Sequence, residues 1–282
     1  MIVFKQKRDL EKEIKSFKRD NRTIGLVPTM GALHEGHLYL VERALANNDV
    51  VIVSIFVNPT QFNNQNDLLK YPRTLQKDIA LLKTVNSNIL VFAPSIEDIY
   101  SNKVNAVKFD FDGLEYEMEG EFREGHFDGV GTIVKQLLEI VKPNNAYFGE
   151  KDFQQLQIIR KLVEKFKIPV KIVGCKIHRE SNGLAMSSRN IRLKSDHKKA
   201  APFIYKTLKT AKIKFGTKSA AYVSKWVKKQ FADQDLLKLE YFRIANVDTL
   251  KEVKRKSSNK KYRAFIAVYA DDVRLIDNIA LN

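Results

Sequence analysis

The chain has 282 residues and carries 49 Lys and Arg against 33 Asp and Glu, a formal net charge of +16. Hydrophobic residues make up 44%, enough for a folded core, which excludes a mainly disordered protein. The single cysteine, Cys175, excludes an intrachain disulfide and favours a reducing compartment. The first ten residues lack a hydrophobic signal core, and no apolar stretch approaches the roughly 20 residues that span a bilayer. We therefore expect a soluble, cytoplasmic protein.

The positive charge is concentrated in the last part of the chain. Residues 1–175 hold 24 Lys and Arg and 23 Asp and Glu, whereas residues 176–282 hold 25 and 10, so their net charges are +1 and +15. This asymmetry predicts two domains, residues 1–175 and 176–282. A basic surface attracts phosphate, which raises RNA binding as an alternative function. RNA-recognition sequences such as Arg/Lys-Gly-Phe-Gly-Phe are absent, and the basic residues are scattered along helices, so we do not expect nucleic acid as a partner.

The first part alternates strand-like and helix-like segments. Apolar runs predict strands at residues 23–27 (ended by Pro28), 50–57, 89–93, 146–148 and 170–173. Helical spacing of apolar residues predicts helices at 36–47, 75–82, 129–141 and 153–166. This alternation predicts a Rossmann-like α/β domain, a parallel sheet with helices on both faces, whose ligands bind beyond the carboxyl ends of the strands.

The second part is less regular and predicts a smaller α+β domain. Amphipathic helices are expected at residues 200–215 and 220–231, and strands at 239–244 and 262–269.

A Gly- and His-containing segment, Pro28-Thr-Met-Gly-Ala-Leu-His-Glu-Gly-His37, follows the first of these expected strands. Gly31 and Gly36 allow the backbone to approach a ligand closely, and a helix N-terminus there offers N–H groups to phosphate. His34 and His37 are three residues apart, so they share one face of a helical turn. They are candidates for charge stabilisation or for proton transfer. An ordinary turn with two exposed histidines is the alternative.

A His-x-Gly-His turn after the first strand is typical of α-phosphate-attacking nucleotidyltransferases and class I aminoacyl-tRNA synthetases. Together with four further segments, this one resembles the pantothenate synthetase (pantoate–β-alanine ligase) family. The four segments are Val53-Ser-Ile-Phe-Val-Asn-Pro-Thr-Gln-Phe62, Tyr71-Pro-Arg-Thr-Leu75, Phe148-Gly-Glu-Lys-Asp-Phe-Gln-Gln155 and Gly183-Leu-Ala-Met-Ser-Ser-Arg-Asn190. The resemblance runs from about Val3 to Leu193 and continues more weakly to the C-terminus.

The resemblance implies an ATP-dependent ligase that joins pantoate to β-alanine. Pantoyl adenylate would form with release of pyrophosphate, and the β-alanine amine would then displace AMP to give pantothenate, a precursor of coenzyme A. ATP is the implied co-substrate and Mg²⁺ the implied metal, because phosphate charge must be compensated. The resemblance also implies a homodimer formed through the N-terminal domain.

The resemblance further assigns residues to the nucleotide. It implies His37 as proton donor, His34 and Lys151 as cationic groups at the phosphates, and Arg189 in a second phosphate-binding loop. The implied ATP-binding residues are Thr29, Met30, Gly31, Ala32, Leu33, His34, Glu35, Gly36, His37, Gly149, Glu150, Lys151, Asp152, His178, Met186, Ser187, Ser188 and Arg189. We expect the basic C-terminal domain, which would carry the 186–189 loop, to act as a lid over ATP.

The implied substrate-binding residues are Asn58, Gln61, Tyr71, Arg123 and Gln155. The Gln61 amide suits a ligand with hydroxyls and a carboxylate because it both donates and accepts hydrogen bonds. Simpler explanations exist for two of them: Asn58-Pro59 could end a strand, and Tyr71 could be a buried aromatic residue.

The Mg²⁺ ligands are undecided. Asp78 and Asp152 are candidates, with an exposed helical acid and a helix N-cap as the respective alternatives.

Three positions depart from the family pattern: Glu124, His178 and Arg192 replace residues that are usually Pro, apolar and Tyr, respectively. The competing enzymatic hypothesis is a different nucleotidyltransferase of the same superfamily, one that retains AMP or CMP in its product. The Asn58-Pro-Thr-Gln61 segment and Gln155 argue against that alternative.

Overall fold

The structure is a computed structural model that describes residues 1–100 and 103–282. The chain divides into two compact units. Unit 1 comprises Met1–Glu150 and Gln155–Lys176, and unit 2 comprises Lys151–Gln154 and Ile177–Asn282. The short segment Lys151–Gln154 therefore groups with the C-terminal unit, which the charge pattern did not indicate.

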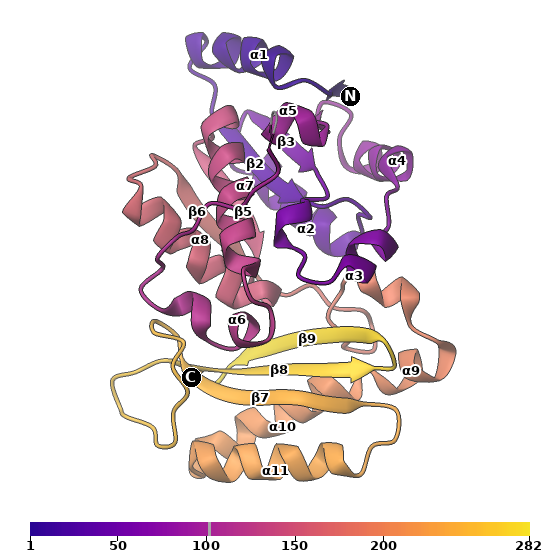
Figure 1. The fold of residues 1–282 in the computed structure, drawn as a ribbon, viewed down its shortest axis with the longest axis vertical. Coiled ribbons are helices and arrows are strands. Elements are labelled where there is room, and N and C mark those ends of the chain that lie inside the picture. The colour runs from indigo at the N-terminus through magenta and orange to yellow at the C-terminus, as the bar shows by residue number, and fades with distance from the viewer. Residues whose placement is uncertain (101–102) are drawn as a thin grey trace. The chain divides into compact units, whose positions relative to one another are not determined.

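Unit 1 is built on a six-stranded parallel sheet with strand order β1-β4-β3-β2-β5-β6 (Figure 1). The strands are β1 Ile2–Phe4, β2 Ile24–Thr29, β3 Val50–Ile55, β4 Leu90–Phe92, β5 Asn145–Gly149 and β6 Lys171–Cys175. Strand β3 lies in the middle and is buried along almost its whole length, as its continuous β-branched run predicts. The predicted Rossmann-like parallel sheet is confirmed.

Helices cover this sheet and close its core. They are α1 Lys7–Arg19, α2 Glu35–Leu45, α3 Gln65–Lys70, α4 Leu75–Val85, α5 Ile96–Tyr100, α6 Glu119–Phe122, α7 His126–Val141 and α8 Phe153–Lys165. Leu40, Val41 and Ala44 of α2 pack against Val27 of β2 and Val53 of β3. Ile52, the β3 residue that points to the opposite face, is also fully buried. The sheet is therefore covered on both faces.

One strand boundary differs from the prediction. Strand β2 continues through Pro28 to Thr29, where the sequence pattern predicted a stop. The register to β5 includes only Gly25 and Leu26, so at Pro28 the strand pairs with β3 alone. Proline has no backbone N–H to donate. It is tolerated at this position because the strand has a hydrogen-bonded neighbour on one side only, so a donor toward the other side is not needed.

Unit 2 is a three-stranded antiparallel sheet, β7-β8-β9, with helices packed on it (Figure 1). Its strands are β7 Lys238–Asn246, β8 Tyr262–Ala270 and β9 Val273–Ala280, and its helices are α9 Ser195–Ala200, α10 Phe203–Thr217 and α11 Ala220–Ala232. Leu208 of α10 and Val227 of α11 are fully buried against the apolar side of the sheet. This confirms the predicted smaller α+β part, although β9 was not predicted. Within residues 1–100 and 103–282, no helix is both long and apolar enough to span a membrane.

Gly129 should be needed for close packing of α7 against the 3-10 turn Pro59–Gln61. A Cβ at Gly129 would lie 2.2 Å from the carbonyl oxygen of Thr60, which is a backbone atom that cannot rotate away. We expect Gly129→Ala to lower the free energy of unfolding by about 1–3 kcal/mol. Gly216→Ala is the matched control, because a Cβ at this α10 position meets no atom within 4 Å and should be neutral or stabilising. Equal thermal stability of the two variants would contradict the packing role.

Candidate active site

The loop between β2 and α2 has an unusual backbone that a single carboxylate holds in place. Gly31 has φ +83° and Ala32 has φ +50°, a left-handed conformation that is costly for alanine. The N–H groups of Ala32 and Leu33 donate to the Asp78 carboxylate at 3.1 and 2.8 Å. Thr74 Oγ1 donates to the same carboxylate at 3.1 Å. Asp78, on α4, therefore determines where the backbone of the 30–34 loop lies.

Asp78 differs from one of the two sequence-based expectations for it. Its side chain is buried, with 2% exposure, so the exposed helical acid is wrong. Both of its oxygens accept N–H groups of the loop, and its role as a Mg²⁺ ligand stays a prediction. Within the described ranges 1–100 and 103–282, no group of three or more His, Cys, Asp and Glu side chains could hold a metal ion. The described residues therefore do not form a protein cage for Mg²⁺.

His34 and His37 form a reciprocal cap at the start of α2. His34 Nδ1 accepts the N–H of Gly36 at 3.2 Å, and His37 Nδ1 accepts the N–H of His34 at 3.3 Å. Their ring centroids are 4.1 Å apart. Because each Nδ1 is an acceptor, the proton of each neutral ring lies on Nε2. The cap thus fixes the tautomer of both half-buried histidines, with the ring proton on Nε2.

Gln61 is oriented by a chain of hydrogen bonds that begins at the backbone. Asn58 Nδ2 donates to the carbonyl oxygen of Gly129 at 3.1 Å and to Gln61 Oε1 at 3.1 Å. Asn58 Oδ1 accepts from Tyr100 Oη at 2.5 Å and from Thr60 Oγ1 at 3.0 Å. A carbonyl can only accept, so the Asn58 amide has one orientation and Gln61 must present Nε2 as its donor.

Asn58 is almost fully buried, with 1% exposure, and its contacts are those of a side chain that orients Gln61. The Gln61 Nε2 group contacts Met30 Sδ at 2.8 Å, so the ends of β2 and β3 meet as expected for neighbouring parallel strands. Burial raises the pKa of Tyr100, which keeps its phenol protonated and able to donate to Asn58.

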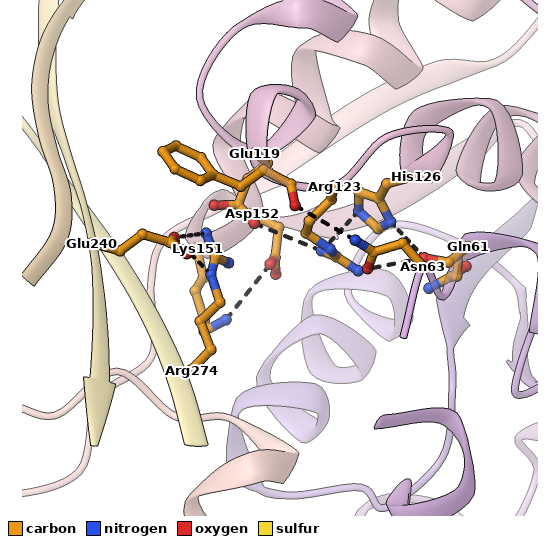
Figure 2. Close-up of polar contacts among 10 residues, drawn as sticks. Gln61, Asn63, Glu119, Arg123, His126, Lys151, Asp152, Glu240 and Arg274 are labelled. Atoms are coloured by element: carbon orange, nitrogen blue, oxygen red, sulfur yellow. Dashed lines mark hydrogen bonds and ion pairs between the residues drawn. The ribbon is translucent and has the colours of Figure 1, made fainter. Parts of the chain in front are cut away.

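Arg123 and His126 are joined to the backbone of Gln61 (Figure 2). His126 Nδ1 lies 2.8 Å from the Gln61 carbonyl oxygen and must donate its proton to it. His126 Nε2 is then the acceptor for Arg123 Nη1 at 3.1 Å, and Arg123 also lies 3.6 Å from the Glu119 carboxylate. His126 is buried, whereas Arg123 is partly exposed. Both residues thus brace the turn that carries Gln61.

The Gly149–Asp152 segment spans the two units. Gly149 ends β5 and belongs with Glu150 to unit 1, while Lys151 and Asp152 belong to unit 2. Lys151 Nζ lies 3.5 Å from Asp152 Oδ1. Figure 2 shows these two side chains pointing toward one another. Asp152 therefore forms an ion pair with the adjacent lysine.

Residues 178–192 in unit 2 form a hairpin followed by a short turn. The N–H of Met186 donates to the carbonyl of His178 at 3.1 Å, and Arg179 bridges to Ala185. Ser187 then caps the 3-10 helix Ser188–Arg192 by accepting the N–H of Arg189 at 3.2 Å. This arrangement places the backbone of His178 directly beside Met186, the first residue of the 186–189 loop.

The remaining predicted residues occupy varied environments. Tyr71 is buried and packs edge-on against Phe62 with ring centroids 5.6 Å apart, which matches the alternative of a buried aromatic residue. Gln155 is partly exposed in unit 1, whereas its neighbour Gln154 is buried in unit 2. Two of the departures lie at the surface. Glu124 is exposed, and Arg192 donates to Asp272 at 3.0 Å.

Sequence reasoning missed the residues that hold the candidate site residues in place. Tyr100 and Thr60 hydrogen-bond to Asn58. In unit 2, Asp277 and Asn278 of β9 contact Arg179 and the backbone of Lys151, respectively. No local pattern marks these side chains, because each acts on a residue or segment that lies elsewhere in the fold.

Comparison with known families assigns the chain to one of them. The sequence model described as "Pantoate-beta-alanine ligase" matches residues 2–280. The chain belongs to the pantoate–β-alanine ligase family. Relatives named pantothenate synthetase include those of Flavobacterium psychrophilum, 60% identical, and Christiangramia forsetii, 59% identical. Each alignment covers 100% of both chains.

Solved structures of pantoate–β-alanine ligases have the same fold. The pantothenate synthetase of Thermus thermophilus superposes with a TM-score of 0.92 at 36% identity, covering 100% of this chain and 99% of that one. The Francisella tularensis enzyme, described as complexed with β-γ ATP and β-alanine, gives 0.81 at 38% identity, with coverage of 100% and 98%.

Replacing Asp78 by Asn should loosen the 30–34 loop. The amide keeps one acceptor oxygen but turns an NH₂ group toward a backbone N–H, so one buried donor loses its partner. We expect Asp78→Asn to lower the free energy of unfolding by about 1–3 kcal/mol, measured by urea denaturation. Asp20→Asn is the control, since that side chain is 55% exposed, and it should change the value by less than about 0.5 kcal/mol. Indistinguishable denaturation curves would rule out the holding role of Asp78.

Proposed function

We propose that this chain is an AMP-forming pantoate–β-alanine ligase that makes pantothenate for coenzyme A biosynthesis. The observation that carries the proposal is the family match over residues 2–280, together with full-length relatives at 60% identity. ATP and β-alanine are proposed as two of its substrates because both occur in the description of the Francisella tularensis complex. Pantoate follows from the family.

The reaction has two displacement steps. A pantoate carboxylate oxygen attacks the α-phosphorus of ATP, and the bond from that phosphorus to the α–β bridging oxygen breaks, so pyrophosphate leaves with its electron pair. The β-alanine nitrogen then attacks the acyl carbon, the bond to the AMP oxygen breaks and the amine loses a proton. The first step makes the poor acyl donor reactive, and it requires positioned groups that compensate negative charge at phosphorus.

His34 and His37 supply donors for that first step. Their capped Nδ1 atoms place the ring protons on Nε2 at the N-terminus of α2, and we assign these N–H groups to the phosphate oxygens. A helix N-terminus favours negative charge, so the two rings and the helix would act on the same phosphates. We assign His37 as the proton donor to the leaving group, and His34 as a further donor to phosphate. Lys151 and Arg189 are the further cationic groups that we assign to the phosphates.

Gln61 would bind pantoate through Nε2. The direction of the hydrogen bonds from Gly129 through Asn58 makes this nitrogen the donor end of the amide, and its two N–H groups suit both the Met30 sulfur and a carboxylate or hydroxyl oxygen of pantoate. Gln155 and Tyr71 would complete this pocket. Arg123 would act mainly through the turn that carries Gln61, because its guanidinium approaches the Gln61 carbonyl at 3.4 Å.

The metal, the assembly and the compartment follow from the same proposal. Mg²⁺ would arrive bound to the phosphates of ATP, with Asp78 and Asp152 as the candidate protein ligands. We further propose a homodimer through the N-terminal unit, a cytoplasmic location and a lid function for unit 2.

An assay with separate products tests the function. The protein is incubated with ATP, Mg²⁺ and pantoate, with and without β-alanine, while pyrophosphate and pantothenate are followed separately. Pyrophosphate should depend on pantoate, and pantothenate on both pantoate and β-alanine. A product that retains AMP or CMP would instead favour a different nucleotidyltransferase.

His37→Ala should lower the rate of adenylate formation by at least about 10²-fold, because a proton donor and charge stabiliser is lost. The rate is measured as pantoate-dependent pyrophosphate release in a single turnover. His37→Asn is the matched control for the cap, since its side-chain oxygen can replace Nδ1 as acceptor but leaves no Nε2–H. Near-normal turnover of either variant would contradict the catalytic assignment.

Gln61→Glu should raise KM for pantoate by at least about 10-fold, because a carboxylate cannot donate to the substrate and repels its negative charge. Gln65→Glu makes the same change at an exposed position of α3 and should leave KM unchanged. Steady-state kinetics at saturating ATP measure both. A shift in KM for ATP alone would place Gln61 at the nucleotide instead.

A further inference from the structure

Strand β9 places two adjacent polar residues in the core of unit 2. Asp277 is 4% exposed and Asn278 is 2% exposed. Successive side chains of a strand point to opposite faces of the sheet, so the two residues reach different surroundings although they are neighbours in the chain. Buried polar side chains normally have hydrogen-bond partners, so the partners of these two residues show which segments they hold.

Asp277 holds the hairpin that begins with His178. Arg179 donates to both Asp277 oxygens, from Nη1 at 2.7 Å and from Nη2 at 2.9 Å. Nη1 also donates to the carbonyl of Gly183 at 3.1 Å, and the guanidinium carbon lies 3.6 Å from the ring centroid of Tyr205 on α10. A two-point contact of this kind fixes direction as well as distance. The hairpin that leads to Met186–Arg189 is therefore attached to β9.

Asn278 holds the turn that carries Lys151. Its Nδ2 donates to the carbonyl oxygen of Lys151 at 2.8 Å, and its Oδ1 accepts a hydrogen bond from Arg263 Nη1. The Arg263 guanidinium carbon lies 4.0 Å from the ring centroid of Phe153, two residues after Lys151. Because Arg263 can only donate, Asn278 must direct its NH₂ group at Lys151.

We propose that Asp277 and Asn278 are positioning residues for ATP: β9 holds the 178–189 segment through one and the Lys151 turn through the other. This inference rests on the proposed function, in which both segments bind the nucleotide. The proposal gives neither residue a contact with ATP. Together they set the distance between two groups of phosphate-binding residues within unit 2, and small displacements of such groups are costly for catalysis.

Two substitutions of nearly unchanged size separate the two contacts. Asp277→Asn removes the charge and one of the two acceptors of Arg179, so the hairpin loses its two-point attachment. Asn278→Asp retains an acceptor for Arg263 and gains an ion pair, but it sets a carboxylate oxygen against the Lys151 carbonyl. Arg179→Lys is a second test of the hairpin contact in case Asp277→Asn folds poorly. It retains the charge and loses the two-point geometry.

Titration calorimetry with Mg²⁺-ATP and single-turnover pyrophosphate release test the proposal. We expect Asp277→Asn to weaken ATP binding by at least about 10-fold, and Asn278→Asp to lower the rate of adenylate formation by at least about 10-fold. KM for β-alanine and the reaction of preformed pantoyl adenylate with β-alanine should stay within about twofold of the wild type, since those measurements do not require the triphosphate contacts.

Val227→Ala is the control for stability alone. It removes buried volume from α11, a helix of the same unit that contains no residue of either segment, so it should lower the melting temperature with unchanged ATP parameters. The proposal is wrong if the β9 variants keep wild-type ATP affinity and adenylation rate, or if Val227→Ala alters them as strongly. A wild type that binds ATP but forms no adenylate, with ATP binding still weakened by Asp277→Asn, would overturn the proposed reaction and leave the positioning role standing.

Discussion

The arrangement of unit 1 depends on one buried carboxylate. Asp78 accepts the N–H groups of Ala32 and Leu33, in a loop where Ala32 has a left-handed backbone. That conformation is unfavourable by itself and persists because the charge-assisted hydrogen bonds offset its cost. The loop leads directly into His34 and the start of α2, so the same contact determines where both histidines lie. A carboxylate that the sequence suggested as a candidate metal ligand thus holds the backbone of the loop.

Directed hydrogen bonds recur at several of these groups. A backbone carbonyl or N–H, whose role is invariable, starts the chain, and side-chain amides or imidazoles then have one possible orientation. Gly129 acts in this way on Asn58 and Gln61, and the N–H of His34 acts on His37. In unit 2 the guanidinium of Arg263 plays this part for Asn278. The benefit is preorganisation, because groups that are already oriented need not reorganise when substrate binds.

Much of the fold follows from local patterns, and the exceptions have physical causes. The runs that predicted β2 to β6 and helices α2, α4, α7 and α8 are regular because those elements bury continuous apolar faces. Helix α1 has the same helical spacing of apolar residues, and Leu10, Ile14 and Phe17 are buried. The apolar pattern of strand β9 is weaker, because Asp277 and Asn278 interrupt its apolar residues. These two residues are the ones through which β9 contacts Arg179 and Lys151.

The sequence by itself determined the family, the parallel sheet and the set of chemically suitable residues. These depend on residue type, order and short spacing, which are properties of neighbouring residues. Only the tertiary structure decided which residues hold the others in place. Asp78 meets Leu33 across 45 positions, and Arg179 meets Asp277 across 98. Such pairs leave no periodic trace, because a hydrogen bond depends on the distance and direction between two groups in space, whatever their separation along the chain.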